Sequence, residues 1–466
     1  MAYNVLVIVC DTLRADILSL YGGAAKTPFL NSFSRSAMVY NNCIAPSPWT
    51  YPSHVSLFTG LYSSEHGVHE TEKVKLLDIT DFHKELKTDS IVESHFFCTG
   101  KFTGNINSAQ MKGERIAEYL SRRGYNTYGI SNNIMVSPYT YFDKGFDSFF
   151  SLDAEPKTNI HNLVSEAKKF GSGMGDIIKV LLKRGQLKDI IKYAGAWMKI
   201  KSINKAMNYP IEKGSILTNN LISNGKLEAP FFSFINLFEM HEPYDGYDPK
   251  ETWENFTGVK RITSKKASFL KRQYVKEAEY LDLALERLIK TMKKKGVYDD
   301  TMIIITSDHG QAFNEHNYMF HNTYLYDELI RIPMIIKYPK NKKFEKRPGY
   351  QSLVNVPKLI HETVEGGDDS ALTKESAFSE AYGSVTILPN IYRDRKKYVK
   401  QKYEKMRKAV YRDGFKLVVN GTDGIIEEFT KDGKDADPQR FGQKLKELTE
   451  ELDIFKGSEK FKTPPV

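Results

Sequence analysis

Five segments of the chain are almost continuously apolar, and each is followed closely by polar side chains. Runs of this kind, rich in β-branched or aromatic residues, are typical of strands that are buried on both faces of a sheet. The segments are Asn4–Cys10, Thr127–Ile130, Phe231–Phe238, Thr301–Thr306 and Pro333–Lys337. The pattern therefore predicts a sheet that is covered on both sides.

Helical patterns lie between these strands. One spans Gly113–Arg123, and a second spans Lys276–Lys294, where Leu281, Leu285 and Leu288 recur at helical spacing. Strands that alternate with helices predict an α/β fold, in which helices flank a large, mostly parallel sheet on both faces.

Two stretches fit this alternation poorly, and we expect them to be inserts. The first, residues 79–112, is polar, and the second spans residues 157–228. Both would interrupt a single large domain that spans residues 1–375. Residues 376–466 predict a small C-terminal α+β unit, because short strand patterns there are separated by turn residues and followed by a helix. Its predicted elements are strands at 408–411, 415–420 and 425–429 and a helix at 441–452.

The middle of the second insert, residues 176–205, is basic and amphipathic. It holds eight Lys or Arg against two Asp, interleaved with apolar residues. Such a helical segment can lie on an anionic membrane or cover an active site. The alternative is an ordinary helical insert that packs its apolar side on the domain. The pattern leaves both interpretations open.

Composition and charge exclude several classes of protein. The chain has 466 residues, of which 41% are hydrophobic, so it can bury a large core and is not disordered. The most apolar run, Pro230–Phe238, is half the length of a membrane-spanning helix. Three scattered cysteines give no disulfide framework, and the first residues do not resemble a secretory signal, so we expect a cytoplasmic location. The net charge of +9 favours anionic substrates or surfaces.

Polar side chains at strand ends are the first candidates for chemistry. Asp11, His241 and the Asp308-His309 pair each follow a predicted buried strand. In parallel sheets, ligands bind beyond the carboxyl ends of the strands. A single aspartate in this position is more often a helix cap or turn residue, but three such strands favour a shared site.

Thr50 is the candidate nucleophile. It precedes Pro52 and a predicted helix over Ser53–Phe58, so it would lie at or just before a helix N-terminus, where an anion is favoured. A hydroxyl attacks only when its pKa is lowered, which a divalent cation can achieve. Asp11, Asp308, His309 and Thr50 would supply three oxygens and one imidazole, a set compatible with Mn, Zn, Mg or Ca.

These residues lie in motifs that resemble the sulfatase branch of the alkaline phosphatase superfamily. The matching stretches are NVLVIVCDTLRAD, TPFLNSFSRSAMVYNNCIAPSPWTYPSHVSLFTGLYSSEHGV, RRGYNTYGISNN, MHEPYD, TMIIITSDHGQAFNEHN and HNTYLYDELIRIPMII. The resemblance covers most of the chain apart from the two inserts, and it implies an alkaline phosphatase-like fold. The terminal RDGFKLVVN is similar to the family's small terminal sheet.

The resemblance also implies roles for single residues. Asp11, Asp308 and His309 would bind the metal, and Thr50 would be both ligand and nucleophile. Three histidines take family positions: His241 would contact the anion, His321 would contact the ester and protonate the leaving oxygen, and His54 would replace the family's arginine and orient Thr50. By position, Arg14 and Asn133 are candidate substrate contacts. The plainer interpretations are a strand-end role for His241, a surface role for His321 and a capping role for Arg14.

Two departures from the family pattern change the expected chemistry. Sulfatases have Cys or Ser at the nucleophile position, oxidised to formylglycine, whereas oxidation of Thr50 would give a ketone. The direct threonine nucleophile is instead similar to phosphodiesterase, phosphonate monoester hydrolase and phosphoglycerol transferase relatives. Thr12 replaces a second metal-binding aspartate, which favours Mn or Zn. One metal ion is expected, although Asp245, His241 and His321 could furnish a second site.

We therefore interpret the chain as a metal-dependent hydrolase of small anionic esters, with phosphodiesters or phosphonate monoesters favoured over sulfate esters. The alternatives are a head-group transferase that docks on anionic membranes through residues 176–205, a sulfatase that needs no formylglycine, and a non-catalytic basic binding protein. No nucleic acid partner is expected, and the sequence gives no oligomeric state.

Overall fold

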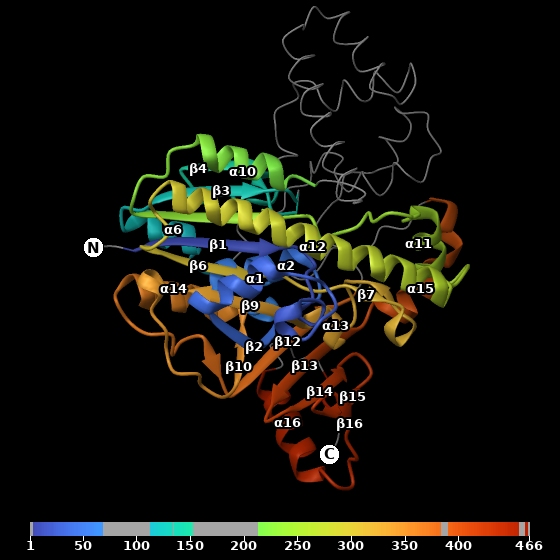
Figure 1. The fold of residues 1–466 in the computed structure, drawn as a ribbon. Helices are drawn as coiled ribbons and strands as arrows, with labels where there is room; N and C mark the ends of the chain where they lie inside the picture. The colour runs from blue at the N-terminus through green and yellow to red at the C-terminus, as the bar shows by residue number, and fades with distance from the viewer. Residues whose placement is uncertain are drawn as a thin grey trace, which may run out of the picture.

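A computed structural model of the chain describes residues 3–68, 112–133, 135–151, 213–383, 390–455 and 462–464. At the centre of these residues lies a nine-stranded sheet with the order β11-β10-β2-β9-β6-β1-β5-β3-β4 (Figure 1). In this order the strands are Thr373–Lys374, Tyr350–Ser352, Met38–Ile44, Arg331–Lys337, Thr301–Thr306, Asn4–Cys10, Phe231–Leu237, Asn126–Ser131 and Ser148–Ser151. The basic segment 176–205 and nearly all of the first insert lie outside the described residues.

The central strands run in one direction. β1 pairs in parallel with β5 and β6, and β3 pairs in parallel with β5 and β4. β9 runs the other way, since it pairs antiparallel with both β6 and β2. The prediction of a large, mostly parallel sheet is confirmed. As a consequence, the carboxyl ends of β1, β3, β5 and β6 meet at one edge of the sheet.

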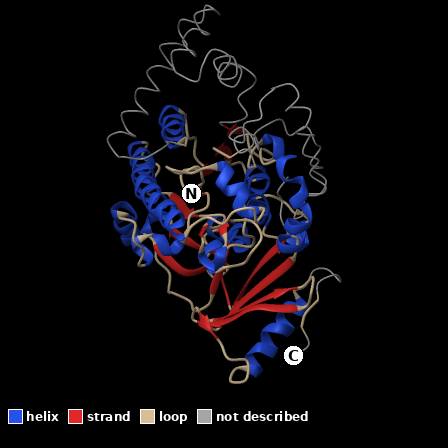
Figure 2. Ribbon diagram, turned by 90° about the vertical axis from the view of Figure 1, so that its right-hand side faces the viewer, coloured by secondary structure: helices blue, strands red, loops and turns tan. Residues whose placement is uncertain are grey.

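Both faces of the sheet are covered, as the continuous apolar strands require. Val5, Val7 and Val9 of β1 belong to one hydrophobic cluster, whereas Leu6 and Ile8 belong to another on the opposite face. Helices α2, α6 and α14 contribute to the first cluster, and α1, α10 and α12 contribute to the second. Figure 2 shows helices on both sides of the central strands. The six helices span Thr50–Thr59, Ile116–Arg122, Val356–Val364, Pro28–Phe33, Ser215–Asn224 and Ser264–Lys294.

Helix α12 is longer than predicted. Its 31 residues begin at Ser264 rather than near Lys276, and the side chain of Thr263 caps it by accepting a hydrogen bond from the Lys266 amide at 3.2 Å. The first turns contain many charged residues, which hide the helical spacing of the buried Ala267 and Leu270. The long helix runs alongside the central strands and extends beyond their ends (Figure 1).

A second, antiparallel sheet follows the first. Its strands β12 to β16 pair in chain order, and helix α16 packs on them through Leu445, Leu448 and Leu452. The predicted small C-terminal α+β unit is therefore present, although its first strand, β12, was not predicted. The strands and helix span Ser376–Tyr382, Met406–Arg412, Phe415–Asn420, Ile425–Lys431, Lys434–Asp435 and Gly442–Ile454.

Short elements complete the described structure. They are α3 Ser63–His66, α11 Pro249–Phe256, α13 Asp327–Ile330, α15 Lys396–Tyr403, and the two-stranded sheet of β7 Ala312–Phe313 and β8 Met319–Phe320. Among the described residues, no helix combines the length and the apolar character that crossing a membrane requires.

Candidate active site

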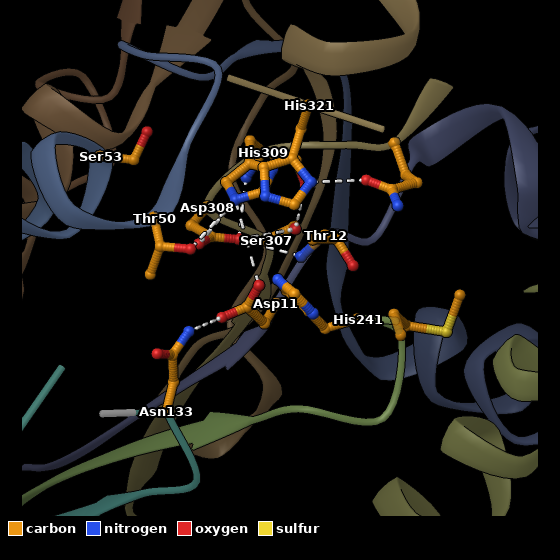
Figure 3. Close-up of polar contacts among 12 residues, drawn as sticks. Asp11, Thr12, Thr50, Ser53, Asn133, His241, Ser307, Asp308, His309 and His321 are labelled. Atoms are coloured by element: carbon orange, nitrogen blue, oxygen red, sulfur yellow. Dashed lines mark hydrogen bonds and ion pairs between the residues drawn. The ribbon is translucent and has the colours of Figure 1, made fainter. Parts of the chain in front are cut away.

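The predicted metal ligands and nucleophile come together at the carboxyl edge of the sheet (Figure 3). Asp11 directly follows β1, and Asp308 and His309 follow β6 by two and three residues. Ligand atoms of these three residues lie within 4.8 Å of one another, and all three side chains are buried. Thr50 enters from the first turn of α2. Residues from distant parts of the sequence thus form one cluster.

The Thr50 hydroxyl faces the imidazole of His309. Its Oγ1 lies 3.2 Å from His309 Nε2, which is also 3.4 Å from Asp308 Oδ2 and 4.0 Å from Asp11 Oδ1. His309 Nδ1 donates to the Gly310 carbonyl at 2.9 Å. Because a carbonyl oxygen only accepts, this bond places the proton on Nδ1 and leaves the Nε2 lone pair directed into the cluster.

The two carboxylates each keep one oxygen without a hydrogen-bond partner. Asp11 Oδ2 accepts from Asn133 Nδ2 at 2.7 Å, and Asp308 Oδ1 accepts from the amides of Thr12 and His309 at 3.1 and 2.9 Å. Asp11 Oδ1 and Asp308 Oδ2 are buried and have no such partner. Buried carboxylate oxygens left in this state are costly. The donor set therefore fits a divalent cation, which both oxygens, His309 Nε2 and Thr50 Oγ1 could bind.

Burial and mutual repulsion shape the charges of this pair. Burial and the charge of Asp308 raise the pKa of Asp11 well above its ordinary value. Burial also acts to raise the pKa of Asp308, but His309, His54 and backbone amides hold it below its ordinary value. Thr12 supplies one of these amides, and its left-handed backbone conformation (φ 61°) turns that amide toward Asp308. Thr12 thus contributes its backbone amide, rather than a side-chain ligand, to the carboxylate pair.

His54 lies behind the nucleophile and holds its backbone. Its Nδ1 donates to the Thr50 carbonyl at 2.9 Å, and its Nε2 accepts from Asn236 Nδ2 at 3.1 Å. The ring packs edge-on against Phe142 and Phe234, and burial lowers its pKa. A neutral imidazole with one donor and one acceptor matches these contacts. The geometry suits the predicted orienting role.

His241 and His321 form a second group beside the first. Their ring centroids lie 5.2 Å apart, and His321 is 4.6 Å from the ring of His309. Figure 3 shows both histidines around the Asp11–Asp308 cluster. Glu242 completes this group, since a carboxylate oxygen lies within 4.8 Å of a ring nitrogen from each histidine. Asp245, which we expected in a second metal site, is exposed and is not in the group.

The two predicted substrate contacts differ in their surroundings. Asn133 is in the cluster, where it donates to Asp11, so its amide supports a candidate ligand. The guanidinium of Arg14 is buried and bound elsewhere, to Asp16 at 2.6 and 2.8 Å, to Glu315 at 2.9 Å and to the Gln311 carbonyl at 3.0 Å. These contacts give Arg14 a structural role, and its expected role as an anion contact stays a prediction.

Three residues of the site escaped the sequence analysis, namely Asn236, Glu242 and Gln311. Asn236 is a buried amide inside a mostly apolar strand, and that contrast could have identified it. Glu242 follows His241, and Gln311 follows the Asp308-His309 pair by two residues. Only the fold reveals that Gln311 contacts Glu242, from which it is separated by 69 residues.

Comparison with known proteins agrees with this architecture. The family model described as sulfatase matches residues 3–364. The chain belongs to the sulfatase family. Among curated proteins of this family, an ulvan-active sulfatase of Formosa agariphila is 23% identical over 401 residues, which cover 80% of this chain and 65% of the relative. An N-acetylglucosamine-6-O-sulfatase of Bacteroides thetaiotaomicron is 36% identical over 362 residues, which cover 72% of this chain and 63% of the relative.

Solved structures of the family share the fold. A phosphonate monoester hydrolase of Agrobacterium radiobacter aligns with a TM-score of 0.61 at 16% identity, covering 97% of this chain and 95% of that protein. Sulfatases and phosphonate monoester hydrolases both occur among the neighbours, and all have the alkaline phosphatase-like architecture. The chain spans just under two thirds of the length of the two curated relatives named above.

Proposed function

We propose that this sulfatase-family chain is a metal-dependent hydrolase of phosphodiesters or phosphonate monoesters, with Thr50 as the nucleophile. The observation that carries the proposal is the contact of Thr50 Oγ1 with His309 Nε2, beside two buried carboxylate oxygens that have no hydrogen-bond partner. A threonine has a secondary alcohol, so it cannot yield the aldehyde of formylglycine. Direct attack by the hydroxyl is the chemistry that remains for this residue.

The cluster around Asp11 and Asp308 would hold the cation. Asp11, Asp308, His309 and Thr50 offer three oxygens and one nitrogen, which suit Mn, Zn, Mg or Ca. When bound, a divalent cation lowers the pKa of a hydroxyl ligand and offsets the negative charge of the ester. Asn133 keeps Asp11 oriented for this task, because its amide donates to the carboxylate oxygen opposite the unpaired one.

The reaction would proceed in two displacements. Thr50 Oγ1 loses its proton to solvent and attacks phosphorus, while the bond from phosphorus to the leaving oxygen breaks in line. His321 Nε2 gives a proton to that oxygen, so an alcohol departs and a phosphothreonine ester remains. His321 then takes a proton from water, which attacks phosphorus and releases Thr50. His241 lies beside His321 and would bind the oxygens of the ester.

The decisive experiment is a matrix of metals and substrates. Aryl phosphodiester, phosphonate, phosphate and sulfate esters are tested with Mn, Zn, Mg and Ca on the wild type and on Thr50→Ala. We expect diester or phosphonate turnover to exceed sulfate turnover. Thr50→Ala should lose at least about three orders of magnitude in kcat/KM, roughly 4 kcal/mol in barrier.

Thr50→Ser is the matched control, because it keeps the hydroxyl and removes only a methyl group. We expect it to retain most of the wild-type rate. The intact mass of the peptide that contains Thr50 should equal that of unmodified threonine. Sulfate ester turnover that survives Thr50→Ala would refute the assignment of the nucleophile.

A further inference from the structure

Gln311 links two members of the second group, His321 and Glu242, through its side-chain amide. Its Oε1 lies 2.6 Å from His321 Nδ1, and its Nε2 lies 2.8 Å from Glu242 Oε2. The Gln311 side chain is fully buried. A buried amide with a partner on each side is fixed in orientation.

The chemistry of the partners determines where the protons are. An ionised carboxylate only accepts hydrogen bonds, so the Gln311 amide nitrogen must face Glu242. The amide oxygen then faces His321 and can only accept. The proton of His321 is therefore on Nδ1, and Nε2, on the other side of the ring, carries the lone pair or the second proton.

The surrounding backbone holds both ends of this link. Arg14 donates to the Gln311 carbonyl at 3.0 Å, which fixes the main chain just after the Asp308-His309 pair. Tyr318 donates to the His321 carbonyl at 2.5 Å. Phe320, the residue before His321, has a left-handed backbone conformation (φ 71°), which is rare for a bulky side chain. Several contacts thus converge to hold the ring of His321 in one place.

We propose that Gln311 is a positioning residue, which sets the ring orientation and tautomer of His321 so that Nε2 delivers the proton to the leaving oxygen. The proposal rests on the role of His321 in the proposed function. His321 enters this step as an imidazolium with a proton on each ring nitrogen. As the bond from phosphorus to oxygen breaks, the Nε2 proton passes to the leaving oxygen, and the ring remains as a neutral imidazole whose Nδ1 proton stays on Gln311. The amide is suited to this task because it accepts from one neighbour and donates to the other.

Neither glutamate nor an apolar residue can replace both functions. Glutamate at this position could accept from His321, but it would place a second carboxylate against Glu242. Leucine has a similar size and makes neither bond. Gln311→Leu should therefore let the ring rotate or change tautomer while it leaves the volume of the core nearly unchanged.

The test is the dependence of rate on the leaving group. A series of aryl esters with increasingly basic leaving phenols is run on the wild type and on Gln311→Leu, with the ester class that the wild type hydrolyses fastest. A nitrophenolate needs little proton assistance, so its ester should lose less than about tenfold in kcat/KM, whereas the least acidic phenol should lose about a hundredfold or more. The choice of ester class keeps failure of the phosphoester proposal separate from failure of the Gln311 proposal.

Gln351→Leu is the matched control. Gln351 is also buried and uses one amide hydrogen bond, to Thr373 at 3.1 Å in the strand pair β10–β11, outside the site. It should leave the leaving-group dependence unchanged. In a His321→Ala background, Gln311→Leu should add no further change, because the group that it positions is gone.

A second readout does not depend on turnover. In the metal-free chain labelled with ¹⁵N-histidine, the signal assigned to His321 by its loss in His321→Ala should report the Nδ1–H tautomer, and Gln311→Leu should shift it. An unchanged tautomer, or an equal loss for all leaving groups, would overturn the proposal. A fall in bound metal from two ions to one in Gln311→Leu would also overturn it, because His321, His241 and Glu242 would then be ligands of a second cation.

Discussion

At the scale of single residues, the neighbouring carboxylates of Asp11 and Asp308 repel each other in the site. Both are fully buried, and each leaves one oxygen without a partner. The charged form of Asp11 is the less favourable of the two, since burial and the neighbouring charge raise its pKa. Without a cation, the folded chain is therefore destabilised at this point, and a bound cation should reverse the effect.

Asp11→Asn tests separately the destabilisation without a cation and the stabilisation by a bound cation. The asparagine oxygen can still accept from Asn133, but the repulsion with Asp308 disappears. We therefore expect the thermal midpoint of the chelator-treated chain to rise, while the further increase on adding Mn or Zn falls to nearly zero. Differential scanning fluorimetry with and without metal measures both changes. Asp300→Asn, at a partly exposed position outside the cluster, is the control and should keep the metal-induced increase. If metal raised the thermal midpoint of Asp11→Asn as much as that of Asp300→Asn, Asp11 would be excluded as a ligand.

The sequence located these residues because of their positions and missed others for a physical reason. Asp11 and Asp308 follow apolar strands whose ends must meet in a parallel sheet, so their proximity could be predicted. Arg14 shares that neighbourhood, but its contacts with Asp16 and Glu315 depend on the path of the chain after the strands. The link from Gln311 to Glu242 joins two loops, and no local pattern in either loop encodes it.

At the scale of elements, the carboxylate of Glu315 connects the β7–β8 hairpin to Arg14 and to helix α12. Glu315 accepts from Arg14 at 2.9 Å, from Lys271 of α12 at 2.8 Å and from the amide of Phe313. Burial acts to raise the pKa of Glu315, but Arg14, Lys271 and the Phe313 amide lower it to about 2. The hairpin carries His321 just beyond β8, so this carboxylate supports the candidate acid through its element.

Glu315→Gln should remove a stabilisation that depends on pH. Because the folded pKa lies below the ordinary value near 4.5, the wild type has the full stabilisation above about pH 4.5 and loses it as pH falls toward 2. At pH 7 the variant should be about 1–2 kcal/mol less stable, less than the pKa shift alone implies, because solvent reaches the pair. Urea denaturation at pH 7 and at pH 3 should show the difference between the two proteins narrowing at the lower pH.

Glu286→Gln, at a partly exposed position of α12, is the control for this measurement. Glu286 forms an ion pair with Lys290 across one helical turn, so its removal should change stability by a few tenths of a kcal/mol at most. A difference at pH 3 as large as at pH 7 would contradict the charge-based account of Glu315.

The elements themselves were predicted where burial is uniform and missed where it is mixed. β1, β5 and β6 are buried along their whole length, so their apolar runs identified them. β2 alternates buried, partly buried and exposed residues over MVYNNCI, and its central asparagines conceal it. β12 contains Ser379 and Glu380, which are polar in sequence although both are fully buried in the structure, so its pattern does not read as a buried strand.

At the scale of the whole molecule, the second sheet supports the nucleophile. The amide of Glu380 in β12 donates to the Pro46 carbonyl at 2.9 Å, four residues before Thr50. The Glu380 carboxylate accepts from the amide of Ser64 at 2.8 Å and pairs with buried Lys408 of β13. The C-terminal unit thus extends its hydrogen bonds into the segment that positions Thr50.

This connection predicts that the two sheets unfold together and that Lys408 stabilises both. Lys408→Met would leave Glu380 buried without its ammonium partner, at a cost of about 3–5 kcal/mol. Hydrogen exchange of peptides from β13 and α2, measured with increasing urea, should show one shared transition that moves to lower urea in both.

The added change Glu380→Gln should recover part of the loss, because it removes the unpaired charge. Lys431→Met, at an exposed position of the same sheet, should leave the urea transitions of the β13 and α2 peptides unchanged. If β13 unfolded first in Lys408→Met while α2 kept its protection, the second sheet would be an appendage rather than a support for the site.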